Sequence, residues 1–161
     1  FNTVQTIQAM ESKSVKVFMG MGGNFARATP DSSRTEEALA KCELTVQVTT
    51  KLNKTHLAHG KKALILPCLG RSELDVQASG EQSVTVEDSM GVVHSSRGRN
   101  QPASENLKSE VAIVVGMARA AFTKNQKIWQ ALQDDYRLIR KKIEAVLPEL
   151  FEDYNLSLIH I

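Results

Sequence analysis

The sequence contains little cysteine and few aromatic residues, and it carries almost no net charge. Its two cysteines, Cys42 and Cys68, lie far apart, and neither belongs to a C-x-x-C pair. They cannot by themselves bind zinc or an iron–sulfur cluster, and the lack of a disulfide framework favours a reduced, cytoplasmic setting. The net charge of +2 indicates no particular partner. Acidic residues interrupt the basic stretch Lys124–Lys142, as on the solvated face of a helix, so we expect no nucleic-acid partner.

Long apolar runs are missing as well. The longest apolar run without a charge, Val111–Ala118, is far too short to cross a bilayer. No basic segment followed by an apolar one stands at the start of the chain. We therefore expect no membrane partner. The apolar fraction of 42% and the charged fraction of 24% are those of an ordinary globular domain.

Both ends of the chain are unusual. The chain opens on Phe1 rather than methionine, and the spacing of Val4, Ile7 and Met10 predicts that it opens inside a helix. We therefore expect it to be a piece of a longer protein. The last six residues, Leu156–Ile161, resemble the translation of a sequencing-library adapter, which predicts a non-native tail.

What the sequence does contain is a glycine-rich strand end. The apolar run that starts at Val15 predicts a buried strand, and it stops in Gly20, Gly22, Gly23 and Asn24. Glycine permits backbone angles and close approaches that a Cβ forbids, and ligands bind outside the carboxyl ends of parallel strands. Such glycines also form plain tight turns. The pattern alone leaves both interpretations open.

The remaining pattern predicts an α/β fold with a largely parallel sheet, flanking helices, a long loop-rich insertion and a C-terminal helical segment. The first expected elements are a helix at 34–41 that begins at a capping box at 33–36, a strand at 44–49 with one better-buried face, and a strand at 63–66 buried on both sides. A loop region at 71–101 with one hairpin follows. Helices at 107–122 and 128–146 come last, and we expect their apolar stripes to form the core. Tyr136 falls on the second stripe, so we expect it to be a packing residue.

Two further polar groups each allow two interpretations, and a histidine pair allows one. Thr49 and its neighbours could contact a polar ligand or form a solvated loop. The stretch Arg97–Gln101 could bind an anion or form a salt-bridged surface loop. His56 and His59 lie three residues apart, but no third ligand stands near them, so we expect them to be structural or exposed and not metal ligands.

The order of these motifs resembles one family, the molybdopterin-dependent oxidoreductases of the formate dehydrogenase and dimethyl sulfoxide reductase type. Within it, the sequence is most similar to formate-dehydrogenase-like alpha subunits of the cytoplasmic kind. The motifs that carry the resemblance are Met19–Asn24, Leu44–Thr49 with Asn53–Thr55, Ala63–Pro67, Ser89–Val93 and Ser96–Gln101.

The resemblance implies a cofactor, molybdenum bis(molybdopterin guanine dinucleotide), and a set of cofactor-binding residues. The positions that match the family's motifs are Gly23, Asn24, Val48, Thr49, Ser89 and Glu110. Relatives often have an acidic residue where this chain has Thr49, and some have a lysine where it has Ser89. The segment Leu69–Val84 is also longer than the usual connection.

The resemblance further implies a division into three parts: a partial α/β cofactor-binding domain at 1–122, a helical segment at 123–155 and the tail at 156–161. It implies a cytoplasmic enzyme that acts on formate or a similar small substrate and passes electrons to a partner. No residue matches the family's iron–sulfur ligands or its molybdenum ligand, so no catalytic or metal-binding residue is expected in this chain. The alternative is a free-standing, non-catalytic α/β module that binds a nucleotide or a protein.

Overall fold

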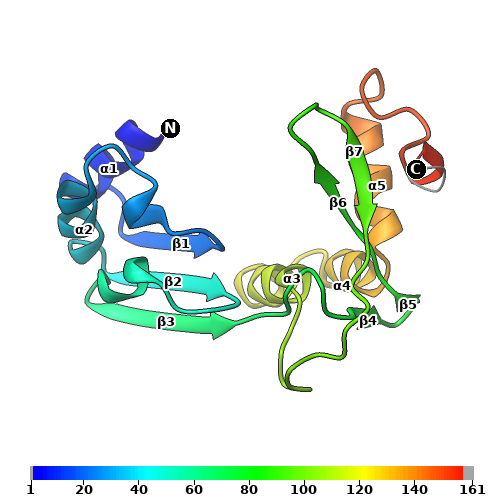
Figure 1. The fold of residues 1–161 in the computed structure, drawn as a ribbon, viewed down its shortest axis with the longest axis horizontal. Helices are drawn as coiled ribbons and strands as arrows, with labels where there is room; N and C mark the ends of the chain where they lie inside the picture. Colours follow the sequence, from blue (N-terminus) through cyan, green and yellow to red (C-terminus); the bar gives the residue numbers. More distant parts are fainter. Residues whose placement is uncertain (1, 158–161) are drawn as a thin grey trace. The chain divides into compact units, whose positions relative to one another are not determined.

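The computed structural model describes residues 2–157 and divides the chain into two compact units (Figure 1). Unit 1 comprises Phe1–Cys68 and unit 2 comprises Leu69–Ile161. The predicted tail lies mostly outside the described residues. The predicted domain boundaries after residues 122 and 155 remain predictions.

Unit 1 is built on a three-stranded parallel sheet in the order β1-β2-β3 (Figure 1). Its elements are α1 (Thr3–Glu11), β1 (Val17–Met21), η1 (Phe25–Arg27), α2 (Ser32–Ala40), β2 (Leu44–Thr49), η2 (Lys54–Leu57) and β3 (Lys62–Pro67). The register places Val17 opposite Leu44 and Leu44 opposite Lys62. The predicted α/β architecture, with a parallel sheet and flanking helices, is confirmed.

The helices of unit 1 pack on one face of this sheet. The core joins Met10 of α1 and Leu39 of α2, both fully buried, with Phe18 of β1 packed against it. The register places Thr45 and Gln47 of β2 on the same face as Phe18. The strand order steps in one direction, and crossovers between parallel strands are almost always right-handed, so both connections are expected on the same face.

The other face of the sheet is apolar apart from Lys62, and no helix among residues 2–68 packs on it. It carries Val17, Met19 and Met21 from β1, Leu44, Val46 and Val48 from β2, and Leu64 and Leu66 from β3. Val17 and Leu64 are 55% and 51% exposed.

The predicted burial of the strands is corrected accordingly. β3 was expected to be buried on both sides, but most of its residues are exposed because it is an edge strand. β1 is the other edge and is only partly buried. β2 was expected to have one better-buried face, and instead both faces are buried from Thr45 to Thr49 because it is the central strand.

Two helix starts also differ from expectation. α1 begins at Thr3, where Asn2 and Gln5 form a capping box, so the described chain does not open inside a helix. α2 is capped by Asp31, whose side chain accepts from the Arg34 backbone N–H at 3.0 Å, and not by Ser33.

Unit 2 contains two β-hairpins followed by helices. Its elements are β4 (Val76–Gln77), β5 (Gly80–Glu81), β6 (Val84–Glu87), β7 (Val93–Ser96), α3 (Glu110–Ala121), α4 (Gln126–Asp134), α5 (Tyr136–Val146) and α6 (Tyr154–Ser157). The β6–β7 hairpin confirms the predicted one, and β4–β5 is an additional hairpin. Within residues 2–157, no helix combines the length and the apolar character that a membrane crossing requires.

The predicted helix at 128–146 is two helices. Asp135 has extended backbone angles, ends α4 and caps α5 by accepting from the Arg137 backbone N–H at 2.9 Å. The break turns the apolar stripe into two separate faces. Of the expected core stripes, only Val115 and Tyr136 are buried, so the prediction that the stripes form the core is wrong.

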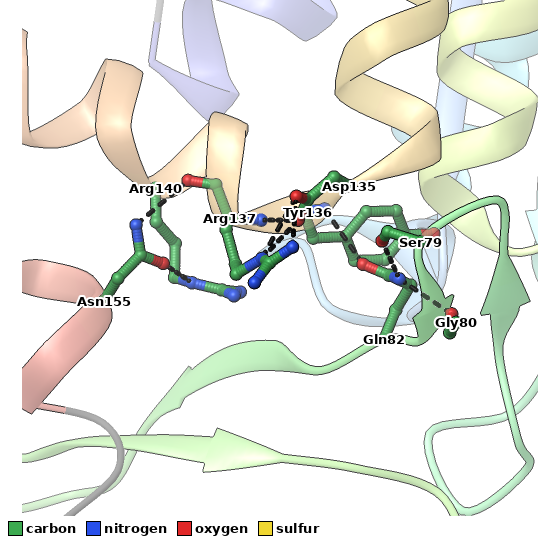
Figure 2. Close-up of polar contacts among 8 residues, drawn as sticks. All are labelled: Ser79, Gly80, Gln82, Asp135, Tyr136, Arg137, Arg140 and Asn155. Atoms are coloured by element: carbon green, nitrogen blue, oxygen red, sulfur yellow. Dashed lines mark hydrogen bonds and ion pairs between the residues drawn. The ribbon is translucent and has the colours of Figure 1, made fainter.

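Polar side chains fix the start of α5 (Figure 2). The Gln82 amide oxygen accepts from the Tyr136 backbone N–H at 2.9 Å, and its nitrogen donates to Ser79 Oγ and to the Gly80 carbonyl, each at 2.8 Å. Arg140 donates to Asn155 Oδ1 at 2.7 Å. Since Gln82 is buried, its hydrogen bonds are shielded from water and attach α5 to the β4–β5 hairpin, whereas the Arg140 bond attaches α5 to α6.

Candidate functional site

The loop that follows β1 presents open backbone at the carboxyl edge of the unit 1 sheet. Gly22 and Gly23 have φ angles of +64° and +67°, and an added Cβ at either would meet no atom within 4 Å. The left-handed conformation, rather than a close neighbour, therefore requires glycine here.

Several N–H groups of this loop have no internal partner. The Gly22 N–H donates to the Val48 carbonyl at 2.8 Å, which holds the loop beside β2. Over the described part of the chain, the backbone N–H groups of Gly23, Asn24 and Phe25 donate to no other residue. Three adjacent free donors at a strand end can bind an anion.

A second loop, between β2 and η2, fixes the first. Asn53 Nδ2 donates to the Gly23 carbonyl at 2.7 Å, and Thr55 Oγ1 donates to Asn24 Oδ1 at 2.7 Å. Thr55 is buried and also accepts from the Ala26 backbone N–H at 3.0 Å. The Asn24 side chain is therefore held by its oxygen, and its Nδ2 donates to none of residues 2–157.

Val48 and Thr49 lie at the end of β2, beneath this edge. Val48 is 1% exposed, and its carbonyl accepts from Gly22. Thr49 is buried, and its hydroxyl donates to the Lys51 carbonyl at 2.7 Å, which leaves the oxygen lone pairs as acceptors.

Ser89 lies in unit 2, in the exposed turn of the β6–β7 hairpin. Asp88 organises this turn by accepting from the Met90 backbone N–H at 2.8 Å and from the His94 ring at 2.8 Å. The hydrogen bond from His94 and those from the turn's backbone lower the pKa of Asp88 below its ordinary value. The Ser89 hydroxyl has no hydrogen bond with another described residue.

Glu110 is the first residue of α3 and is exposed. Its carboxylate forms no ion pair or hydrogen bond within the described chain, so it is free to accept from a ligand. Ser109 is the N-cap of α3, and its Oγ accepts from the Ala112 backbone N–H at 3.2 Å. The helix expected at 107–122 therefore begins at Glu110.

Unit 2 also contains a polar cluster that the sequence did not indicate. The Tyr136 hydroxyl lies 2.7 Å from Ser109 Oγ and donates to the Asp75 carboxylate. Burial and the adjacent carboxylate raise the pKa of Tyr136 above its ordinary value. Asp75 and Ser109 line a cavity of about 720 Å³. No spacing along the chain indicates this cluster, because its three residues come from distant segments.

In the stretch Arg97–Gln101, one of the two arginines forms a surface salt bridge, as the second interpretation predicts. Arg97 pairs with Glu81 at 3.5 Å, whereas Arg99 has no ion pair among the described residues. An added Cβ at Gly98 would lie 1.9 Å from the Glu73 carbonyl, so close packing requires this glycine.

The two cysteines and His56 occupy positions typical of structural residues. Cys42 and Cys68 are buried and form no disulfide, and burial raises the pKa of the Cys42 thiol. His56 Nδ1 accepts from the Asn53 backbone N–H at 2.9 Å, as part of a cap. Within the part of the chain that the structure describes, no three His, Cys, Asp or Glu side chains are grouped to hold a metal ion.

The candidate residues thus fall into two groups. Gly23, Asn24, Val48 and Thr49 meet at one edge of unit 1, while Ser89 and Glu110 belong to unit 2. Their roles as cofactor ligands remain predictions.

No protein-family model matches the chain. It is 53% identical over 156 residues to a Mycobacterium tuberculosis protein named "Uncharacterized oxidoreductase Rv2900c", covering 96% of this chain and 20% of that protein. It is 47% identical over 157 residues to "Protein YdeP" of Escherichia coli, covering 98% of this chain and 21% of that protein. The chain therefore has homologues named as oxidoreductases and spans about a fifth of their length.

Proposed function

We propose that this chain is part of a formate-dehydrogenase-like, molybdopterin-dependent oxidoreductase and that it binds the guanine dinucleotide of the cofactor. One observation carries the proposal: the free N–H groups of Gly23, Asn24 and Phe25 at the carboxyl edge of a parallel sheet. Homologues named as oxidoreductases support an enzymatic role for the whole protein. The molybdopterin assignment rests on the motif resemblance.

The residues of this edge fit a phosphate-containing group. Phosphate oxygens need N–H donors and room, and the loop supplies free donors with open space above Gly22 and Gly23. Asn24 adds a side-chain donor whose direction is set by Thr55. The buried side chain of Val48 gives no contact surface, so its contribution is the carbonyl that holds the loop.

The nucleotide end requires acceptors as well as donors. A guanine edge presents N–H donors, which suit a free carboxylate such as Glu110 or a hydroxyl acceptor such as Thr49. Ser89 offers an unpaired hydroxyl. When bound, the molybdenum centre supplies the redox chemistry, and the residues of this chain bind and orient it.

In the whole protein, we propose that the iron–sulfur cluster, the molybdenum ligand and the catalytic residues come from outside this chain. The substrate is then formate or a similar small molecule, and an electron-transfer partner accepts the electrons. We further propose a cytoplasmic location.

The test measures cofactor content in the full-length protein. Asn24→Ala removes a side-chain donor and Glu110→Ala removes an acceptor. Because hydrogen bonds to charged groups contribute about 1.5–3 kcal/mol, each variant should bind the cofactor about tenfold or more weakly. The readouts are molybdenum per protein, by elemental mass spectrometry, and guanosine monophosphate released by acid.

Matched controls are Asn106→Ala and Glu37→Ala, which change exposed residues of the same types that belong to neither group. They should leave both contents unchanged. Full molybdenum and guanine contents in both test variants would rule out the proposed binding residues. A wild-type protein that holds a guanine nucleotide without molybdenum would instead support the nucleotide-binding module.

A further inference from the structure

The two helices that follow α3 leave an apolar groove between them. The groove has a volume of about 390 Å³ and is lined by Ile128 and Leu132 of α4 and by Leu138 of α5. Ile128 is 48% exposed, and Leu132 and Leu138 are only partly buried. The apolar stripe that sequence patterning assigns to the core is therefore open to solvent here.

Three lysines surround this apolar floor: Lys127 of α4, and Lys141 and Lys142 of α5. All three are exposed, and none forms an ion pair with another residue in 2–157. No aspartate or glutamate lines the groove. The site thus combines apolar surface with unpaired positive charge, and the acidic residues nearest in sequence do not neutralise it.

The acidic residues of α4 and α5 have partners elsewhere. Asp135 pairs with Arg137 at 2.7 Å, as Figure 2 shows, and Glu144 accepts from the Asp153 backbone N–H at 3.0 Å. Asp134 accepts from Gln130 at 2.7 Å. None of these three carboxylates pairs with a lysine of the groove in the described chain, so those lysines are available to an external acidic group.

We propose that this groove is a docking site for an acidic amphipathic helix of a partner protein. Such a helix would insert apolar side chains at i, i+3 or i+4 and i+7 spacing between α4 and α5. Its carboxylates would face Lys127, Lys141 and Lys142, because complementary charges orient and select the partner. The concave shape favours a helix, since a membrane surface requires apolar side chains that protrude.

The test uses the full-length protein and a fluorescein-labelled synthetic helical peptide. The probe carries leucines at the stated spacing with glutamates beside them, and fluorescence anisotropy measures binding. A second peptide has lysines in place of the glutamates. The acidic probe should bind, and more weakly when salt is raised from about 0.05 M to about 0.3 M, because screening weakens exposed ion pairs. The basic peptide should bind at least about tenfold more weakly.

Variants locate the binding site. The double change Lys141→Glu and Lys142→Glu should weaken the acidic probe about fivefold or more, because it replaces two attractions by repulsions. Ile128→Ser should weaken it by a similar factor through lost apolar contact. Lys124→Glu is the matched control, since Lys124 is exposed and does not line the groove, and it should change binding by less than about twofold.

Equal binding of the acidic and basic peptides would overturn the proposal, as would unchanged binding in the double variant. Vesicles of phosphatidylglycerol provide a third arm. If they bind the protein and compete with the acidic probe in a lysine-dependent manner, the groove recognises an anionic membrane and the proposed occupant is wrong. Circular dichroism of each variant verifies that the helices remain folded.

Discussion

Tyr136 shows at the scale of one residue how a packing position acquires a polar role. Helical spacing identifies it as a core residue, and it is indeed 2% exposed. Its hydroxyl, however, bonds both Ser109 at the start of α3 and Asp75 before β4, while Gln82 accepts from its backbone N–H. A buried polar network is costly when one member loses its partner. The hydrogen bonds of Tyr136 therefore hold three segments of unit 2 in fixed positions.

Removing the Tyr136 hydroxyl should destabilise the chain. Tyr136→Phe leaves the Asp75 carboxylate and Ser109 without this partner, so the free energy of unfolding should fall by about 1–3 kcal/mol. Urea unfolding of the 161-residue chain at low concentration, near pH 7, measures the change.

The same variant carries a prediction about pH. Burial raises the pKa of Tyr136 in the folded state, so the folded chain retains its proton where the unfolded chain loses it. The stability of the wild type is therefore complete below about pH 10 and declines above it, toward the raised folded-state pKa. The advantage over Tyr136→Phe should shrink above about pH 10. A difference that stays constant across that range would contradict the assignment of the buried hydroxyl.

At the scale of elements, a single residue decides whether unit 2 has one long helix or two. Asp135 has φ −149° and ψ 107°, which ends α4, and its side chain then caps α5 and pairs with Arg137. The apolar spacing continues across this break, so periodicity alone predicts one helix. The cap decides otherwise, because aspartate competes with the helix for backbone N–H groups.

Asp135 variants separate the cap from the charge. Asp135→Ala should lower the free energy of unfolding by about 1 kcal/mol through loss of the cap, whereas Asp135→Asn should lose less because asparagine also caps. Hydrogen bonding to Arg137 lowers the pKa of Asp135. Its charge therefore stabilises the fold above the unfolded-state pKa, near pH 4, and this contribution is lost as the pH falls through the lower folded-state pKa.

Urea unfolding at pH 7 and at descending pH values measures both effects. The gap between the wild type and Asp135→Asn should close below about pH 4. A gap that widens at low pH would show that the ion pair with Arg137 is not the source of the difference.

At the scale of the molecule, the apolar face of the unit 1 sheet opposite the helices is exposed at its edge strands, β1 and β3, and buried at the central strand β2. A parallel sheet ordinarily has both faces covered, and β3 has the composition of such a strand. In this chain Leu64, on the face opposite the helices, is 51% exposed, and Ile65, on the helix side, is 43% exposed because β3 is an edge strand. The apolar composition of β3 is thus typical of a strand that is more buried than β3 is here. This difference agrees with the finding that the chain spans about a fifth of the length of its relatives.

The exposed apolar side chains on this face should make the isolated chain prone to self-association. The 161-residue chain should bind the dye ANS and associate at high concentration, and Leu64→Ser should reduce both while changing the unfolding free energy by less than about 1 kcal/mol. Leu39→Ser, at a fully buried position, is the contrast and should cost several kcal/mol. Analytical ultracentrifugation and dye fluorescence provide the measurements, and equal association of Leu64→Ser and wild type would contradict the role of this face.

The sequence by itself determined most of the local elements and their order, although it missed the caps at Asp31 and Asp135. Strand periodicity, the glycine stop after β1 and the β6–β7 hairpin are read from neighbours in sequence, because they depend on backbone geometry and local hydrogen bonds. The motif order also supplied the family resemblance on which the cofactor proposal rests.

The tertiary structure decided which faces are buried and which polar groups are left free. The sequence could not tell that the middle strand would be β2, that Thr55 would take the Asn24 oxygen, or that Tyr136 would join Ser109 and Asp75. These outcomes depend on contacts between segments tens of residues apart, and no local pattern records them. The free donors after β1 and the open groove between α4 and α5 emerge only once those contacts are made.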